Sequence, residues 1–174
     1  MEGKRLVLKF INFILFFFTV YAFASLAQAD DFQGFRGLNF GDPLPKEGMT
    51  FIKTVPSFGG TDIYSRDADD LNIGAAKLTF IHYYFWQDKL SFITIACSER
   101  HNFSALLAAF TEKFGEPYQE NKYIEKYMWR GKNMIIVSYN KYNEIGTTSV
   151  GSGDIIDEQK NWEKEQAKKA KGDF

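Results

Sequence analysis

The sequence predicts an α+β domain in which an antiparallel sheet carries a helix on one face, with a further helix at the C-terminus. Residues 77–85 and 90–97 are rich in β-branched and aromatic side chains, and the polar connection between them is typical of an antiparallel hairpin. Residues 103–114 instead place apolar side chains at helical spacing. Such an amphipathic helix is expected to cover the apolar face of the sheet.

The helix over residues 103–114 has a continuous apolar stripe and clear end signals. Its stripe consists of Phe103, Leu106, Leu107, Phe110 and Phe114. Asn102 is predicted to cap the start of the helix with its side-chain oxygen. Gly115 can adopt the left-handed conformation that ends a helix, and Pro117 prevents its extension.

Several further strands are expected around this helix. Both faces of residues 90–97 are apolar, which favours a central strand, with Ser91 in solvent at its start. Residues 122–130 and 133–140 form a second predicted hairpin, and residues 147–151 an edge strand. Short strands are expected near residues 51–53 and 62–65. Asp42 and Pro43 resemble the start of a helix of about one turn.

The first 29 residues have the pattern of an export signal. Lys4, Arg5 and Lys9 precede an apolar run over residues 10–26, and Ala27-Gln28-Ala29 offers a cleavage site. A retained membrane anchor is the competing interpretation, because the run is about long enough to cross a bilayer. We expect cleavage, which gives a periplasmic or secreted protein with no stable membrane span. No Cys follows the cleavage point to carry a lipid.

The mature chain is expected to be one domain over residues 30–153, followed by a charged helix or tail over residues 154–174. Acidic residues in the first turn of this tail and lysines in the last suit the helix dipole. An alternative description of the domain is two related but degenerate halves, residues 34–97 and residues 103–150. Removal of residues 1–29 changes the formal net charge from −1 to −3, which disfavours nucleic acid as a partner.

The sequence predicts no catalytic residue, metal site or cofactor. Cys97 and His101 suggest a nucleophile and its base, but Cys97 shares a strand face with Ile93 and Ile95, so we expect a buried, unreactive thiol. His82 is expected to be a buried, hydrogen-bonded histidine. Neither histidine has the spacing of a zinc ligand. The acidic stretch at residues 67–74 departs from a calcium loop and is interpreted as a solvated loop.

Aromatic residues are the main indication of a binding surface, because 12 Phe, 8 Tyr and 3 Trp remain in the mature chain. The candidate ligand-binding or partner-binding residues are Tyr84, Trp86, Tyr123, Tyr127 and Trp129. These rings either fill the core beneath a helix or form a binding surface on the uncovered sheet face. The sequence leaves both alternatives open.

The segment LLAAFTEKFGEPYQENKYIEKYMWRGKNMIIVSYN, within residues 105–140, carries a family resemblance. Its order of helix, Gly, acid, Pro and strand–turn–strand resembles the repeated unit of the BamE-like (SmpA/OmlA) lipoproteins and of the β-lactamase inhibitor proteins. "FGDP" at residues 40–43 resembles "FGEP" at residues 114–117. The resemblance implies an α+β module that binds proteins and lacks catalytic residues, although the lipid-bearing Cys of the lipoproteins is missing here.

The sequence therefore favours an exported, non-enzymatic interaction module of the cell envelope, whose partner is a protein or peptide. One alternative is a binder of a small apolar or carbohydrate ligand, which would use the same aromatic sheet face. The other alternative is a thiol-dependent enzyme, which requires an exposed Cys97 within reach of a histidine.

Overall fold

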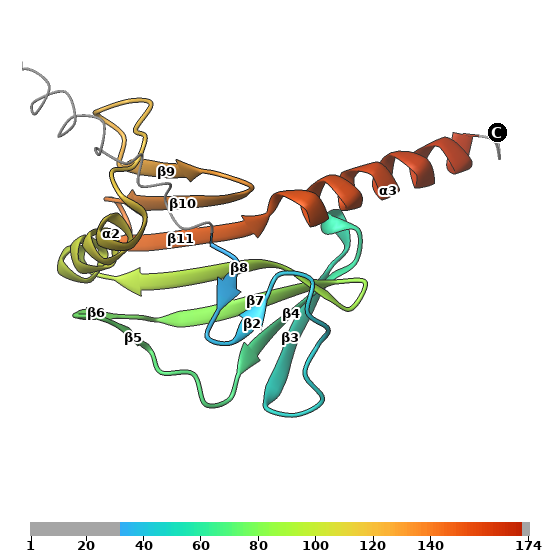
Figure 1. Cartoon of the computed structure of the whole chain (residues 1–174), viewed down its shortest axis with the longest axis horizontal. Coiled ribbons are helices and arrows are strands. Elements are labelled where there is room, and N and C mark those ends of the chain that lie inside the picture. Colours follow the sequence, from blue (N-terminus) through green and yellow to red (C-terminus); the bar gives the residue numbers. More distant parts are fainter. Residues whose placement is uncertain (1–31, 172–174) are drawn as a thin grey trace, which may run out of the picture.

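The computed structural model describes residues 32–171 and confirms the α+β class. Its main sheet has seven strands in the order β3-β4-β7-β8-β11-β10-β9, and every neighbouring pair is antiparallel (Figure 1). In that order the strands are Met49–Val55, Thr61–Arg66, Phe80–Trp86, Lys89–Ser98, Ile145–Ser152, Asn133–Asn140 and Lys126–Arg130. The predicted export signal lies outside the described residues.

Smaller elements complete the part of the chain that the structure describes. Two short hairpins are formed by β1 (Gly34–Phe35) with β2 (Leu38–Asn39) and by β5 (Asn72–Ile73) with β6 (Ala76–Lys77). A 3-10 turn, η1, covers Pro56–Phe58. The helices are α2 (Arg100–Phe114) and α3 (Gly153–Lys171).

Helix α2 covers one face of the sheet and closes the main core. Phe103, Leu106, Phe110 and Phe114 of the predicted stripe are buried, and Leu107 packs at its margin. Facing them are buried side chains from the central strands, which are Ile81, Tyr83, Ile93, Ile95, Ile135, Val137 and Val150. The paired register places these residues on the same side of the sheet, because side chains alternate between faces along each strand.

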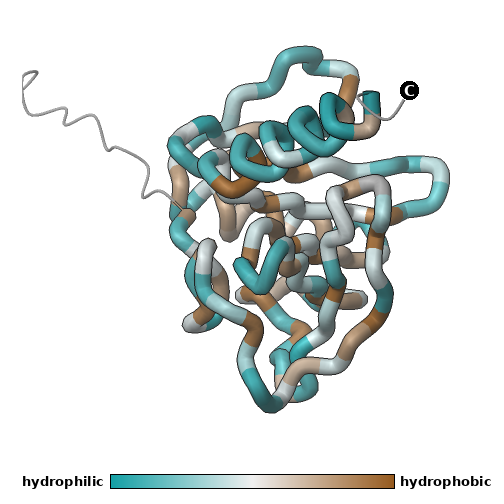
Figure 2. The backbone as a smooth tube through the Cα atoms, turned by 90° about the vertical axis from the view of Figure 1, so that its right-hand side faces the viewer, coloured by the Kyte–Doolittle hydropathy of each residue, from teal (hydrophilic) through white to brown (hydrophobic). Residues whose placement is uncertain are grey.

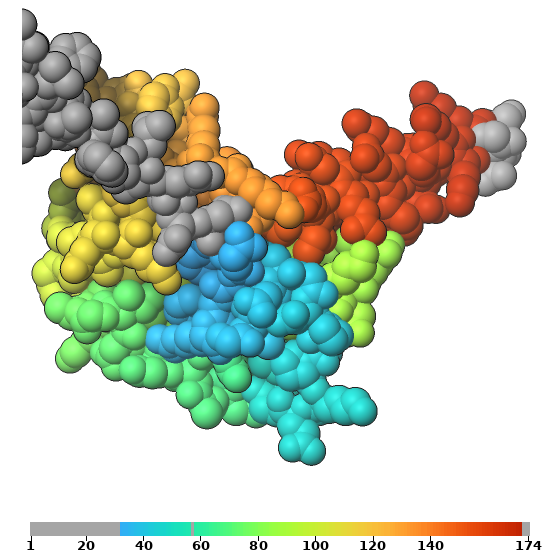
Figure 3. Space-filling view, viewed as in Figure 1, coloured from blue at the N-terminus to red at the C-terminus, as the bar shows by residue number. Residues whose placement is uncertain are grey.

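Helix α3 leaves the end of β11 and projects beyond the body of the domain (Figures 1 and 3). Its residues are mostly hydrophilic (Figure 2). Within α3, only Ile155 and Gln159 are buried. Trp162 lies against Trp86 of β7, with their ring centroids 6.1 Å apart. The predicted C-terminal helix is therefore confirmed, and it contacts the domain through its first turns.

The strand predicted at the sheet edge is in fact central. Strand β11 lies between β8 and β10 and pairs with both along its length. It contains Gly146, where an added Cβ would lie 2.8 Å from Cys97 Sγ and 2.8 Å from a ring atom of Phe103. Small residues are therefore required where α2 approaches this strand. The same small residues made the segment resemble a weak edge strand.

Two predicted helix starts are wrong. Asn102 lies inside the first turn of α2, where it accepts a hydrogen bond from Lys77 N–H and donates one to Ser98 O. Asn102 therefore ties α2 to β6 and to the end of β8, and it does not cap the helix. The turn expected after Asp42 is not helical, and Asp42 Oδ2 accepts a hydrogen bond from Asn39 N–H at 2.7 Å. Gly115 does end α2, with a φ of 78°.

Candidate functional site

The predicted aromatic residues do not form a single surface. Tyr127 and Trp129 of β9 point into the core beneath α2, where Phe110 and Trp129 ring centroids are 6.1 Å apart. Trp129 Nε1 donates a hydrogen bond to Gly115 O at 2.7 Å, which joins β9 to the end of α2. Trp129 therefore belongs to the core, and the half-buried Tyr127 packs against the margin of the core. Tyr84 and Trp86 lie beside α3, and Tyr123 lies in an exposed loop before β9.

Tyr84 lies on the sheet face opposite α2, in the wall of an apolar pocket of about 250 Å³. Phe92 of β8 meets Tyr84 edge-on, with centroids 5.2 Å apart, and Ile156 of α3 and Phe58 of η1 complete the apolar walls. Ser91 also lines the pocket. It is buried, contrary to the prediction, and its hydroxyl donates to Tyr84 O at 3.1 Å. The start of α3 thus turns part of an open sheet face into a cavity.

Gln159 holds this part of α3 against the sheet. Its Nε2 donates to Phe58 O at 2.5 Å and to Thr61 Oγ1 at 3.2 Å. Trp86 is buried beside it, and its indole N–H has no hydrogen-bond partner among the described residues. Thr61, Ser91 and Gln159 use their side chains in hydrogen bonds within the chain, and the remaining lining is mainly apolar.

Strand β3 forms a free edge of the sheet. Among residues 32–171 it pairs only with β4, and its residues are exposed or half-buried throughout. Phe51 is 53 % exposed, and Phe58 in the following turn is 63 % exposed. At the opposite edge, β9 is partly covered by a bridge between Tyr118 and Met128. A long edge strand with exposed apolar residues is a template for pairing with another chain.

Cys97 and His101 do not form a catalytic pair. Cys97 is fully buried on the Ile93 and Ile95 face, as predicted, while His101 is exposed and contacts Glu99 at 3.3 Å. Burial raises the pKa of the Cys97 thiol, and a backbone hydrogen bond at Gly146 lowers it to a smaller extent.

We expect the Cys97 thiol to resist Ellman's reagent in the native protein and to react fully after denaturation, because only an accessible thiolate attacks a disulfide. Labelling is measured by absorbance with and without guanidinium chloride. Native labelling at the rate of a free thiol would contradict the buried, inert assignment.

His82 is half-buried on the face opposite α2, rather than fully buried as predicted. Its ring stacks on Phe80 at a centroid distance of 4.1 Å. Burial lowers the pKa of His82 below its ordinary value of 6.5, and Lys53 nearby lowers it further. The folded protein therefore binds this proton less readily than the unfolded chain, so His82 reduces stability as the pH falls below 6.5.

The His82→Gln variant is expected to lose less stability than the wild type between about pH 7.5 and about pH 5.5. Urea unfolding at both pH values measures the difference. His101→Gln is the matched control for the loss of a histidine, because the His101 side chain is 69 % exposed. Equal losses in His82→Gln and in the wild type would contradict this role of His82.

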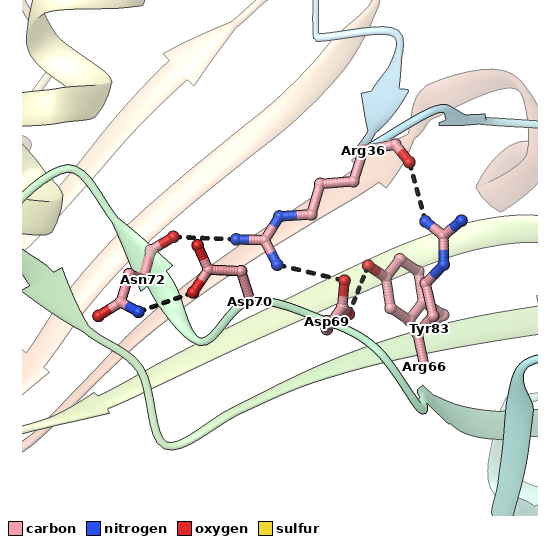
Figure 4. A network of polar contacts seen from close by, with 6 residues as sticks. All are labelled: Arg36, Arg66, Asp69, Asp70, Asn72 and Tyr83. Atoms are coloured by element: carbon pink, nitrogen blue, oxygen red, sulfur yellow. Dashed lines mark hydrogen bonds and ion pairs between the residues drawn. The ribbon is translucent and has the colours of Figure 1, made fainter.

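Residues 67–74 contain a buried acid rather than only solvated ones (Figure 4). The Asp69 side chain is 6 % exposed; it forms an ion pair with Arg36 at 3.2 Å and accepts a hydrogen bond from the Tyr83 hydroxyl at 2.8 Å. Arg36 also donates to Asn72 O, and its own carbonyl accepts from Arg66. The network joins the turn between β1 and β2 to β4, β5 and β7, which indicates a structural role.

The described residues show neither a cluster of metal-ion ligands nor a helix suited to crossing a membrane. Residues 32–171 contain no cluster of three His, Cys, Asp or Glu side chains that would hold a metal ion. Within the same range, no helix has the length and apolar character needed to cross a membrane. Comparison with protein families, curated proteins and solved structures gives no match for this chain.

Sequence reasoning missed the two best-defined surface features, the free β3 edge and the pocket under α3. The run MTFIKTV was expected to be a strand only near residues 51–53, and its place at the edge depends on which strands pair. The pocket requires Ile156 to meet Phe92 across more than sixty residues of sequence, and no local pattern encodes that contact. The aromatic content of the chain was the only signal for either feature.

Proposed function

We propose that this chain is an exported, non-enzymatic module of the cell envelope that binds an extended segment of a partner protein at β3. The free β3 edge carries the proposal. In strand addition, backbone groups of the edge strand bind the incoming segment, and exposed side chains select it. The resemblance of residues 105–140 to BamE-like and β-lactamase-inhibitor modules supports the same class of function.

The geometry of β3 supports an incoming strand on its free side. Gly48 O accepts a hydrogen bond from Asp67 N–H at 3.1 Å. In an antiparallel pair, every second residue of a strand bonds to the partner strand. Met49 and Phe51 are out of phase with Gly48, so their backbone groups point away from β4. Phe51 contacts Tyr64 edge-on at 5.5 Å, which leaves much of its ring exposed. A partner strand would meet both unpaired backbone groups and an apolar side chain.

The test is a pull-down from envelope extract with residues 30–174, comparing the wild type with Phe51→Lys. The charge should prevent capture of a stoichiometric partner without unfolding the domain, because Phe51 lies at the surface. Met134→Lys is the matched control, since the Met134 side chain is also exposed and lies on β10, in the other half of the sheet. Equal capture by all three proteins, or no captured protein, would overturn the proposal.

The apolar pocket under α3 favours a second candidate function, the binding of a small apolar ligand. The apolar part of the pocket is lined by Tyr84, Phe92 and Ile156, and apolar cavities of similar size bind small aromatic molecules. NMR titration with indole tests it, with Ile156→Trp as the variant that fills the pocket. Shifts confined to the pocket residues and lost in Ile156→Trp would support this function; unchanged spectra would exclude indole-like ligands.

A further inference from the structure

Two loops at the β9 side of the domain repeat the same three residues and the same hydrogen bond to the Asn side chain. Asn121-Lys122-Tyr123 precedes β9, and Asn140-Lys141-Tyr142 begins at the last residue of β10. The Tyr123 N–H donates to Asn121 Oδ1 at 2.9 Å, and the Tyr142 N–H donates to Asn140 Oδ1 at 2.9 Å. We call these two segments the Asn-Lys-Tyr loops.

The resemblance between the loops extends to their side chains. Lys122 Nζ lies 5.1 Å from the centre of the Tyr123 ring, and Lys141 Nζ lies 5.3 Å from the centre of the Tyr142 ring. The two tyrosines are 83 % and 89 % exposed, so neither ring contributes to the core. Two large apolar rings held in solvent by the same local device suggest selection for binding rather than for folding.

The two loops meet at one pocket of about 420 Å³. Tyr123 and Tyr142 line it together with Tyr139, whose ring lies 4.9 Å from Phe103 in the core. Tyr139, near the end of β10, donates its N–H to Glu125 O at 2.9 Å, and Glu125 lies between Tyr123 and the start of β9. This bond holds the two loops beside each other. The pocket therefore has an anchored floor and two exposed aromatic walls, and its volume falls within the ~300–1,000 Å³ of typical ligand pockets.

The chemistry of this lining selects among ligand classes. The lining combines three polar residues, Asn140, Lys141 and Glu125, with the three tyrosine rings and Ile124. The Glu125 carboxylate accepts a hydrogen bond from Arg100 and forms an ion pair with it, so charges of both signs are present. A polyanion or a purely apolar molecule fits this mixture poorly. A neutral sugar fits it, because its C–H faces pack on aromatic rings while its hydroxyl groups bond to amide and charged groups.

We propose that the pocket between the Asn-Lys-Tyr loops binds a neutral saccharide, with Tyr123 and Tyr142 as the surfaces on which sugar rings stack. The site goes beyond the proposed function and is independent of it, because β3 lies at the other edge of the sheet. A peptide partner would also use exposed tyrosines, and that possibility is an outcome of the test.

The test is isothermal titration with neutral tetrasaccharides, namely cellotetraose, tetra-N-acetylchitotetraose and maltotetraose. At least one is expected to bind the wild type, and Tyr123→Ala with Tyr142→Ala should weaken that binding at least about tenfold. Tyr142→Phe should retain binding, since it keeps the ring. Tyr118→Ala is the matched control, because Tyr118 is an exposed tyrosine outside the pocket.

Three results would overturn the proposal. Two come from the titration: no tetrasaccharide binds the wild type at millimolar concentration, or the double variant binds the tetrasaccharide as tightly as the wild type does. The third comes from the pull-down with envelope extract: the double variant fails to capture a protein that the wild type captures, while its saccharide binding is unchanged. The last result would assign the loops to a protein partner. Phe51→Lys should leave saccharide binding unchanged, so failure at this site is distinguishable from failure of the β3 proposal. Circular dichroism of each variant verifies that the fold is retained.

Discussion

Replacing Trp129 by alanine is expected to lower the free energy of unfolding by about 3–5 kcal/mol. The Trp129 side chain is buried against Phe110, and truncation leaves a cavity beneath α2 that the neighbouring strands fill only in part. The variant also loses the hydrogen bond from Trp129 Nε1 to Gly115 O. Urea or thermal unfolding followed by circular dichroism measures the loss.

Two further variants separate the causes of this loss. Trp129→Phe keeps most of the apolar contact but removes the indole N–H, so the difference between the two variants isolates the packing. Tyr123→Ala is the exposed control from the same group of predicted aromatic residues, and it should change stability by less than about 0.5 kcal/mol. A loss of partner binding in Trp129→Ala with wild-type stability would return Trp129 to the binding surface.

The sequence was sufficient to predict the elements whose signals are local. The stripe of apolar residues in α2 and the pairing of β7 with β8 depend on spacing within a few turns or on one short connection. Both appear in the structure with ends that differ by a few residues. The C-terminal helix was predicted from the position of its charges, which is also a local property.

The place of β11 could not be predicted, because strand order is set by long-range pairing. Val150 pairs with Ile93 and with Ile135, which are remote or reached only through a turn, and its own segment is rich in Gly, Ser and Thr. The residue types of β11 therefore gave only a weak strand signal, although β11 is a central strand. What matters at Gly146 is the space left by Phe103, and that space exists only after α2 has packed.

The candidate site was predictable only at the level of residue type. Tyr127 and Trp129 alternate correctly along β9, yet the sequence does not say which face α2 covers, so core and surface rings were not separable. The Asn-Lys-Tyr loops contain a local signal, a repeated tripeptide. Their shared pocket depends on β10, which brings two segments nearly twenty residues apart to the same end of the sheet.

The second large effect is expected at Asp69. Asp69→Ala should lower the free energy of unfolding by about 3 kcal/mol, because it leaves the Tyr83 hydroxyl and the Arg36 guanidinium without this partner. We place the value at the lower end for a broken buried pair because Arg36 remains partly solvated. Chemical denaturation measures the change in the unfolding midpoint.

Asp70→Ala is the matched control, because Asp70 is exposed and accepts a hydrogen bond only from Asn72 in the network of Figure 4. It should cost less than about 0.5 kcal/mol. Burial, with a smaller contribution from the Asp69 hydrogen bond, raises the pKa of Tyr83 well above its ordinary value of 10.0. The unfolded chain therefore loses this proton first as the pH rises, and stability should fall above about pH 10.

Tyr83→Phe removes that alkaline loss and separates it from the ion pair of Arg36 with Asp69. The variant should lose stability near neutral pH, since Asp69 then lacks one hydrogen-bond donor, but its stability should fall less steeply above about pH 10. Equal stability of Asp69→Ala and Asp70→Ala would show that the network does not anchor the turn between β1 and β2. In that case the buried contacts of Phe32 and Leu38 would hold the N-terminal segment on the sheet.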